Sequence, residues 1–228
     1  MPPKAASSAV IWVAISLLQA SPPGPPSAAA VAGRVTVLER GNKPANDVGQ
    51  AVIWLEAPNA KAPAPKAISV ATEGKEFRPR VAVVPLGSSV TFPNNDPFNH
   101  NVFSLSDEGA FDLGLYGRGQ AKSTKFTRPG LIRVYCNVHA QMASFILVRD
   151  SPYYTQPSGD GTFSIAGVPA GKYVLHAWHE RATELIQGVE VTPQGVAGLD
   201  LQLDARGYKF VQHLNKFGQP YSSGGARY

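Results

Sequence analysis

Short apolar runs separated by turn-forming residues recur along the chain from residue 34 to residue 203. Alternating apolar and polar positions bounded by Gly, Pro, Asn and Asp are typical of strands and turns rather than helices. The stretch 108–123 is rich in Gly and weakly patterned, and we expect it to be a long loop that crosses between sheets. The sequence therefore predicts an all-β protein with strands at 34–39, 51–55, 68–72, 80–84, 89–92, 101–105, 125–127, 131–136, 143–149, 162–165, 172–178, 187–191 and 199–203.

The spacing of these runs also divides the chain. Seven or eight strands in residues 67–150 fit a Greek-key β-sandwich, and a Pro/Ala/Lys linker at 58–66 precedes them. Residues 31–57 and 159–204 each hold too few strands to bury a core alone. The tail, residues 205–228, is basic and aromatic without a sustained period, so we expect it to dock on a surface or to be disordered.

Residues 1–30 predict an export signal. Lys4 lies in a short basic start, an apolar run covers 9–18, and small residues end the segment at Ala30. The run is too short to span a bilayer comfortably, so we expect cleavage after Ala30 or, second, after Ala20, and no stable membrane insertion afterwards. An uncleaved amino-terminal anchor is the alternative. The sequence thus predicts an exported, periplasmic protein.

Composition supports a globular chain and restricts its partners. The content is 43% hydrophobic and 16% charged, which is enough apolar material for a core. The formal net charge is +5, but the basic residues are dispersed and no RNA-type aromatic motif is present. We therefore expect no nucleic-acid partner.

The single cysteine lies in a stretch that also contains other potential metal ligands. An exported chain with one cysteine forms no internal disulfide, so its thiol needs another explanation. Cys136, His139 and Met142 fall within seven residues, and His100 follows a hydrophobic strand upstream. Two imidazoles, one thiolate and a weak axial thioether are the ligands of a mononuclear electron-transfer copper site. We predict that these four residues bind one copper ion that alternates between Cu(II) and Cu(I).

The order of motifs around these residues resembles the cupredoxins, the family that includes plastocyanin and amicyanin. The resemblance covers roughly residues 67–150, and the spacing from Cys136 to Met142 is similar to that of amicyanin. It implies a type 1 blue copper centre, a supporting role for Asn101, which would join the two ligand loops, and electron exit through His139. The motifs are Phe77-x-Pro79, Val83-Val-Pro-x-Gly87, Val90-Thr-Phe-Pro-Asn-Asn-Asp96, His100-Asn-Val, Pro129-Gly130 and Tyr135-Cys136-x-x-His139-x-x-Met142.

The flanking parts resemble a different family, the transthyretin-like or carboxypeptidase-regulatory-like β-sandwich of immunoglobulin-like outline. The likeness lies in Gly33-Arg-Val-Thr-Val with Val52-Ile-Trp-Leu and in Gly161-Thr-Phe-Ser-Ile with Pro169-Ala-Gly-Lys-Tyr-Val-Leu. We infer one sandwich with the cupredoxin inserted between its second and third strands, because exposed loops tolerate insertions. The alternative assigns 31–57 to the cupredoxin and leaves a small carboxy-terminal module. Proteins of this outline are loosely termed methylamine-utilisation-like.

Other reactive side chains receive simpler interpretations. A Cys-His nucleophilic dyad normally joins separate elements, whereas Cys136 and His139 share one short loop. His176 and His179 lie three apart on a strand and point to opposite faces, which disfavours one shared ion. We expect Trp178 and Tyr173 to be core residues, and His213 to be solvated.

These observations predict an electron carrier with unknown protein redox partners and no enzymatic activity. Two alternatives stay open: copper delivery without redox turnover, and a ligand-binding β-sandwich module. Phe98 and Phe103 are the candidate residues for a docking patch beside His139.

Overall fold

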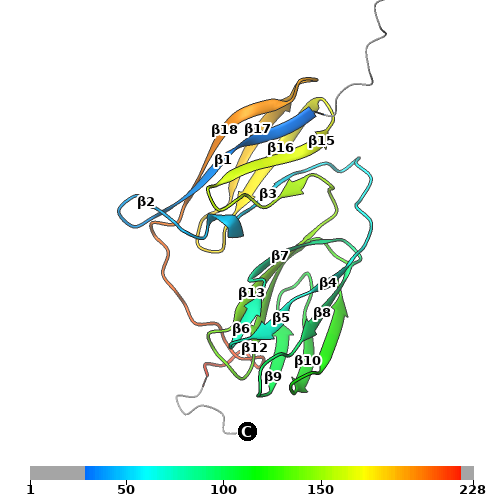
Figure 1. Ribbon diagram of the computed structural model, residues 1–228, viewed down its shortest axis with the longest axis vertical. Coiled ribbons are helices and arrows are strands. Elements are labelled where there is room, and N and C mark those ends of the chain that lie inside the picture. Colours follow the sequence, from blue (N-terminus) through cyan, green and yellow to red (C-terminus); the bar gives the residue numbers. More distant parts are fainter. Residues whose placement is uncertain (1–28, 222–228) are drawn as a thin grey trace, which may run out of the picture.

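The computed structural model describes residues 29–221. These residues form two β-sandwiches joined along the long axis of the molecule, with the sandwich of the two chain ends at the top of Figure 1 and that of residues 67–149 below it. We call them the terminal sandwich and the central sandwich. The all-β prediction is confirmed, since the only helix among the described residues is the 3-10 turn η1 (Val48–Gln50). None of the described helices is long and apolar enough to cross a membrane.

The terminal sandwich combines strands from both ends of the described chain. Its first sheet has the order β15-β1-β18, with β2 paired to β1, and its second has the order β14-β3-β16-β17. β1 pairs in parallel with β18 although more than 150 residues separate them. The strands are β1 (Ala29–Glu39), β2 (Lys43–Pro44), β3 (Val52–Leu55), β14 (Tyr154–Thr155), β15 (Thr162–Val168), β16 (Gly171–Trp178), β17 (Leu185–Val191) and β18 (Val196–Asp204).

The core of the terminal sandwich is shared between residues 29–57 and residues 153–205. Val35 of β1, Leu175 of β16 and Leu201 of β18 are buried in one apolar cluster, so neither half covers its own face. The strands before residue 57 thus pair with the strands after residue 153, and not with the central sandwich as the alternative assignment would require. The exact domain boundaries stay a prediction.

The central sandwich contains the strands of residues 67–149. A five-stranded sheet of order β10-β9-β12-β13-β7 faces a three-stranded sheet of order β11-β8-β4, and β5 and β6 form a separate hairpin. The strands are β4 (Ala67–Ser69), β5 (Ala71–Glu73), β6 (Glu76–Arg78), β7 (Val81–Pro85), β8 (Ser89–Pro93), β9 (His100–Ser104), β10 (Phe111–Tyr116), β11 (Ala121–Lys125), β12 (Gly130–Cys136) and β13 (Ala143–Arg149).

Two local expectations were wrong in this region. The stretch 108–123 is not one crossing loop, because it holds β10 and most of β11, which pair at sheet edges with β9 and β8. A register irregularity and the positive φ of Gly114 interrupt β10, which hides its period in the sequence. The strand expected at 125–127 lies earlier, in β11.

A third apolar cluster joins the two sandwiches. Trp54 and Trp178 from the terminal sandwich pack with Val81 and Leu147 from the central one. Trp178 is 8% exposed, so its predicted core position is confirmed. Arg80 and Glu180 add an ion pair of 2.7 Å across the same junction. The sandwiches are therefore packed against each other rather than joined by linkers alone.

The start of β1 bears on the predicted export signal. Residues 1–28 lie outside the described part of the chain, but Ala29 is the first residue of β1 and is 7% exposed in the core. Cleavage after Ala30 would remove the first two residues of this strand, whereas cleavage after Ala20 would leave β1 whole.

Candidate metal centre

The local sequence of β12 places Cys136 in an apolar environment. Ile132, Val134 and Cys136 alternate with more exposed residues, and all three are fully buried on the face toward the core. The chain then turns through residues 137–142 and returns as β13, which is antiparallel to β12. The turn is closed by a hydrogen bond from the N–H of Met142 to the carbonyl of His139. The predicted ligand segment is therefore a tight connection at one end of the five-stranded sheet.

His100 reaches this connection from the neighbouring strand. β9 pairs with β12 so that Val102 lies opposite Cys136, and His100 begins β9 at the same end of the sheet. The Nδ1 atom of His100 lies 3.5 Å from the Sγ atom of Cys136. The Nδ1 atom of His139 lies 3.7 Å from the same sulfur. The ligand atoms of these three residues all lie within 4.8 Å of one another.

These separations fit a single bound ion. Nitrogen and sulfur ligands at about 2.0 and 2.3 Å from one metal, with angles of about 110–120°, lie about 3.5–3.7 Å apart. Met142 is 1% exposed and belongs to the same buried cluster as Cys136. The donor set of two imidazoles, a thiol and a thioether suits copper. The structure thus brings the three predicted strong ligands together and buries the fourth residue beside them.

Asp96 orients His100. The carboxylate of Asp96 lies 2.9 Å from the Nε2 atom of His100, and it also accepts hydrogen bonds from the main-chain N–H groups of Gly74 and Lys75. With Nε2 donating to Asp96, the Nδ1 lone pair of His100 faces the sulfur of Cys136. The motif that contained Asp96 was recognised in the sequence, but its role was missed. Its position four residues before His100 is the only signal that pointed to it.

Burial sets the protonation of the candidate ligands. It lowers the pKa of His100 and of His139 and raises the pKa of the Cys136 thiol. Burial alone would raise the pKa of Asp96, but hydrogen bonds from Lys75, His100 and Gly74 bring it below its ordinary value. The imidazoles are therefore kept neutral and ready to coordinate, while a metal must displace the proton of the thiol.

Asn101 joins the two ligand segments through its main chain. Its carbonyl accepts a hydrogen bond of 2.9 Å from the N–H of Asn137, the residue after Cys136. Its side chain points elsewhere, because Nδ2 donates to the carboxylate of Asp112 at 2.6 Å. The main chain of Asn101 therefore links the start of β9 to the residue after Cys136, while its role at a metal site stays a prediction.

His139 forms the outer edge of the centre. It is partly exposed, whereas His100, Cys136 and Met142 are buried. The half-buried ring of Phe98 lies 5.3 Å from the ring of His139. Phe103 is 1% exposed and cannot contribute to a docking patch, which corrects that part of the expectation.

The other histidines have different surroundings. His176 stacks on Trp54 and contacts the carboxylates of Glu56 and Glu184 at 3.0 and 2.6 Å. His179 is fully buried, with Nε2 3.6 Å from Asp47. The expectation of a solvated His213 was wrong, since its ring stacks on Tyr135 with centroids 4.0 Å apart.

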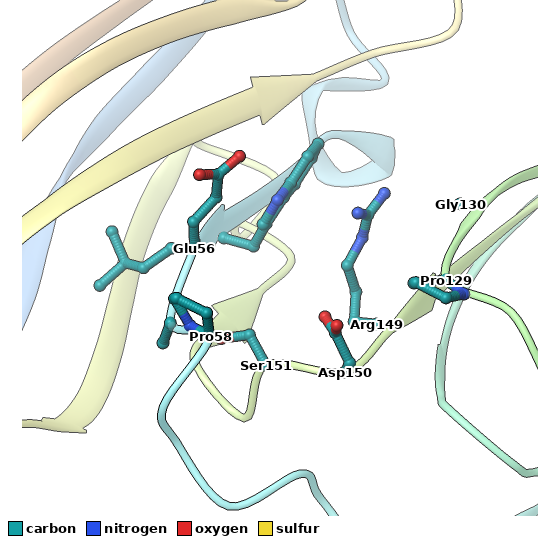
Figure 2. A pocket seen from close by; sticks show the side chains of 10 residues that line it. Glu56, Pro58, Pro129, Gly130, Arg149, Asp150 and Ser151 are labelled. Carbon is teal, nitrogen blue, oxygen red and sulfur yellow. The ribbon is translucent and has the colours of Figure 1, made fainter.

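A cavity of about 380 Å³ lies at the opposite end of the central sandwich. Figure 2 shows Glu56 and Pro58 on one side of it, Pro129 and Gly130 on the other, and Arg149 near the middle. The guanidinium of Arg149 lies 3.9 Å from the ring centroid of Trp54. Gly130 and Cys136 are the first and last of the seven residues of β12, about 20 Å apart along an extended strand. The cavity is therefore separate from the metal centre.

Comparisons with known proteins are informative for part of the chain only. No protein-family profile matches the sequence, and no curated protein matches it. Among solved structures, the chain is similar to a purple cupredoxin from Nitrosopumilus maritimus, with 20% identity, 36% of this chain and 99% of that chain covered, and a TM-score of 0.33.

Two further structures show likeness of the same order. For a copper-containing nitrite reductase from Thermus scotoductus, the identity is 25%, with 51% of this chain and 28% of that chain covered and a TM-score of 0.36. For a reduced amicyanin variant, the identity is 22%, with 42% of this chain and 98% of that chain covered and a TM-score of 0.33. Since these scores are low, the interpretation of the site rests on its own geometry.

Proposed function

We propose that this protein is an exported, periplasmic type 1 copper protein that carries single electrons between protein partners. The observation that carries the proposal is the spacing of 3.5 and 3.7 Å between the sulfur of Cys136 and the imidazole nitrogens of His100 and His139. A copper ion bound there would accept and release one electron by alternating between Cu(II) and Cu(I).

The surrounding chain supplies what such a centre requires. The core around Cys136 and Met142 is apolar and excludes water, which influences both affinity and potential. His100 is fixed by Asp96, so one strong ligand is oriented before any metal binds. Ligands held in this way reorganise little when the charge of a metal changes.

The same arrangement favours transfer over catalysis. Four protein donors around one ion leave no open coordination position for a substrate, in contrast to catalytic metal sites. The partly exposed His139, with Phe98 beside it, is the proposed contact for redox partners. We therefore propose a carrier without enzymatic activity, whose donor and acceptor are proteins.

The test is to add Cu(II) to the purified protein and to Cys136→Ser in parallel. We expect the wild type to develop an intense visible band with a reversible one-electron couple, and the variant to show neither. A band that persists in Cys136→Ser would reject the ligand assignment. A colourless wild type that prefers Cu(I) and donates it to an acceptor would favour copper delivery instead.

Phe103→Leu serves as a matched control, because Phe103 is buried in the same sheet but lies three residues from His100 on β9 and therefore on the opposite face. We expect this variant to keep the visible band. Its loss there would show that the band reports general packing rather than coordination.

A further inference from the structure

The tail of the chain connects the terminal sandwich to the metal end of the central sandwich. Residues 205–221 leave β18 and run down to the end of β12, as the orange-to-red segment of Figure 1 shows. The segment is attached at its start, where the N–H of Ala205 donates to the carbonyl of Leu38 in β1. We refer to residues 205–221 as the strap.

Three consecutive residues at the end of β12 and just beyond it each contact a different residue of the strap. The ring of Tyr135 stacks on the ring of His213, with an interplanar angle of 13°. The carbonyl of Cys136 accepts a hydrogen bond of 2.7 Å from the hydroxyl of Tyr221. The side chain of Asn137 accepts one of 2.9 Å from the N–H of Lys216. The middle residue of the three is the candidate thiolate ligand.

The strap also reaches the strand that carries His100. The ammonium of Lys216 lies 2.7 Å from the carboxylate of Asp112, which in turn accepts the hydrogen bond from the side chain of Asn101. His213 packs edge-on against Tyr221, with ring centroids 5.2 Å apart, so the strap residues also support one another. The strap thus contacts β12 directly and is linked to β9, the strand of His100, through Asp112 of β10.

These contacts fix the peptide group that follows the thiolate. On one side, the N–H of Asn137 donates to the carbonyl of Asn101, and on the other side Tyr221 holds the carbonyl of Cys136. A peptide held from both sides cannot rotate without breaking a hydrogen bond, so the direction of the Cys136 side chain is fixed with it. Outer contacts of this kind influence the affinity and potential of a metal centre.

We propose that the strap is a positioning element of the metal centre, with Tyr221 as the residue that holds the Cys136–Asn137 peptide. The inference rests on the proposed copper function and adds a part of the chain that lies outside the central sandwich. The terminal sandwich provides the attachment from which the strap reaches the end of β12.

The first experiment compares Tyr221→Phe with Tyr208→Phe in the full copper-loaded chain. Tyr221→Phe removes only the hydroxyl, which donates to the carbonyl of Cys136 and lies 3.4 Å from Nδ1 of His213, whereas Tyr208 is 42% exposed on the same strap. We expect Tyr221→Phe to shift the visible band and the reduction potential and to release copper to a chelator roughly 10-fold faster. Tyr208→Phe should match the wild type. A wild-type band, potential and release rate in Tyr221→Phe would overturn the proposal.

The second experiment uses no metal. Hydrogen exchange is measured at the N–H groups of Cys136 and Asn137 in the metal-free wild type, in Tyr221→Phe and in a chain ending at Gly207. We expect faster exchange in both altered chains, since the strap no longer holds this peptide. Unchanged exchange in both would overturn the proposal.

The two experiments separate the failure of one proposal from that of the other. If the wild type binds no copper but exchange accelerates in both altered chains, the copper function fails while the strap still positions this peptide. If the wild type shows the expected band and neither altered chain differs from it, the strap proposal fails alone.

Discussion

The two sandwiches of this chain have similar architecture but cores of different composition. Each sandwich has a cluster of buried hydrophobic residues, nineteen in the terminal sandwich and fifteen in the central one. Of the eleven buried polar residues in the described chain, eight belong to residues 67–149. The remaining three are Ser151, His176 and His179, so the central sandwich buries more polar side chains than the terminal one.

Burying polar groups is unfavourable unless they are hydrogen-bonded, and here most of them serve the metal end. Asn94 donates to the carbonyls of Phe98 and Tyr116, and its own side-chain oxygen accepts from Thr72 and from the N–H of Asp96. Asn94 thus fixes the loop that presents Asp96 to His100. The comparison teaches that one core is optimised for packing and the other for holding a reactive set of side chains.

The largest effects are expected from matched substitutions that create a cavity in each core. Leu175→Ala in β16 and Ile132→Ala in β12 each remove a fully buried side chain, and each should lower the free energy of unfolding by about 2–5 kcal/mol. Denaturant titration measures this loss. Only Ile132→Ala should also accelerate copper release, because Ile132 lies on the ligand face of β12. Loss of the visible band in folded Leu175→Ala would contradict the division of roles.

A smaller effect is expected from Asp96→Asn, which removes the charge that His100 faces but keeps the shape of the side chain. We expect copper affinity to fall about 10- to 100-fold, as is typical when the outer partner of a metal-binding histidine is lost. Competition with a chelator measures this. Asp200→Asn is the matched control, because Asp200 is exposed on β18 of the terminal sandwich. Equal affinity in the two variants would show that Asp96 does not orient the ligand.

The junction between the sandwiches provides a weaker test. Arg80 donates to the carboxylate of Glu180 through Nε and Nη2, but the Arg80 side chain is 38% exposed. Solvent screening limits such a pair, so Glu180→Gln should cost about 1 kcal/mol in the free energy of unfolding. Glu190→Gln, exposed on β17, is the control and should cost almost nothing. If Glu190→Gln lowered the free energy of unfolding as much as Glu180→Gln, the ion pair at the junction would contribute no more than an exposed carboxylate does.

The sequence predicted the candidate metal ligands more completely than the residues that hold them in place. The ligands Cys136, His139 and Met142 are close in sequence and chemically rare, and the strands on either side of them show a clear apolar alternation. The predicted strands 131–136 and 143–149 agree with β12 and β13 to within one residue. Local signals of this kind are sufficient because neighbouring residues determine them.

The missed features depend on contacts between distant segments. His213 stacks on Tyr135, which lies 78 residues earlier in the chain. No local pattern in the tail indicates this aromatic partner. β10 and β11 lie at sheet edges, where exposed positions weaken the apolar period. The parallel pairing of β1 with β18 is equally distant, and the sequence indicated only that the two flanking parts share one sandwich. Such features follow from tertiary packing, which periodicity alone does not encode.

The smallest effect that sharpens the comparison is the pH dependence contributed by one histidine, measured in metal-free protein. Burial lowers the pKa of His139, so below pH about 6.5 the unfolded chain binds this proton more readily than the folded chain does. The free energy of unfolding should therefore fall as the pH is lowered through this range, and His139→Gln should reduce the slope. Denaturant midpoints at pH 7.5, 6.5 and 5.5 measure it. A slope in His139→Gln equal to that of the wild type would mean that His139 does not contribute to the pH dependence of folding.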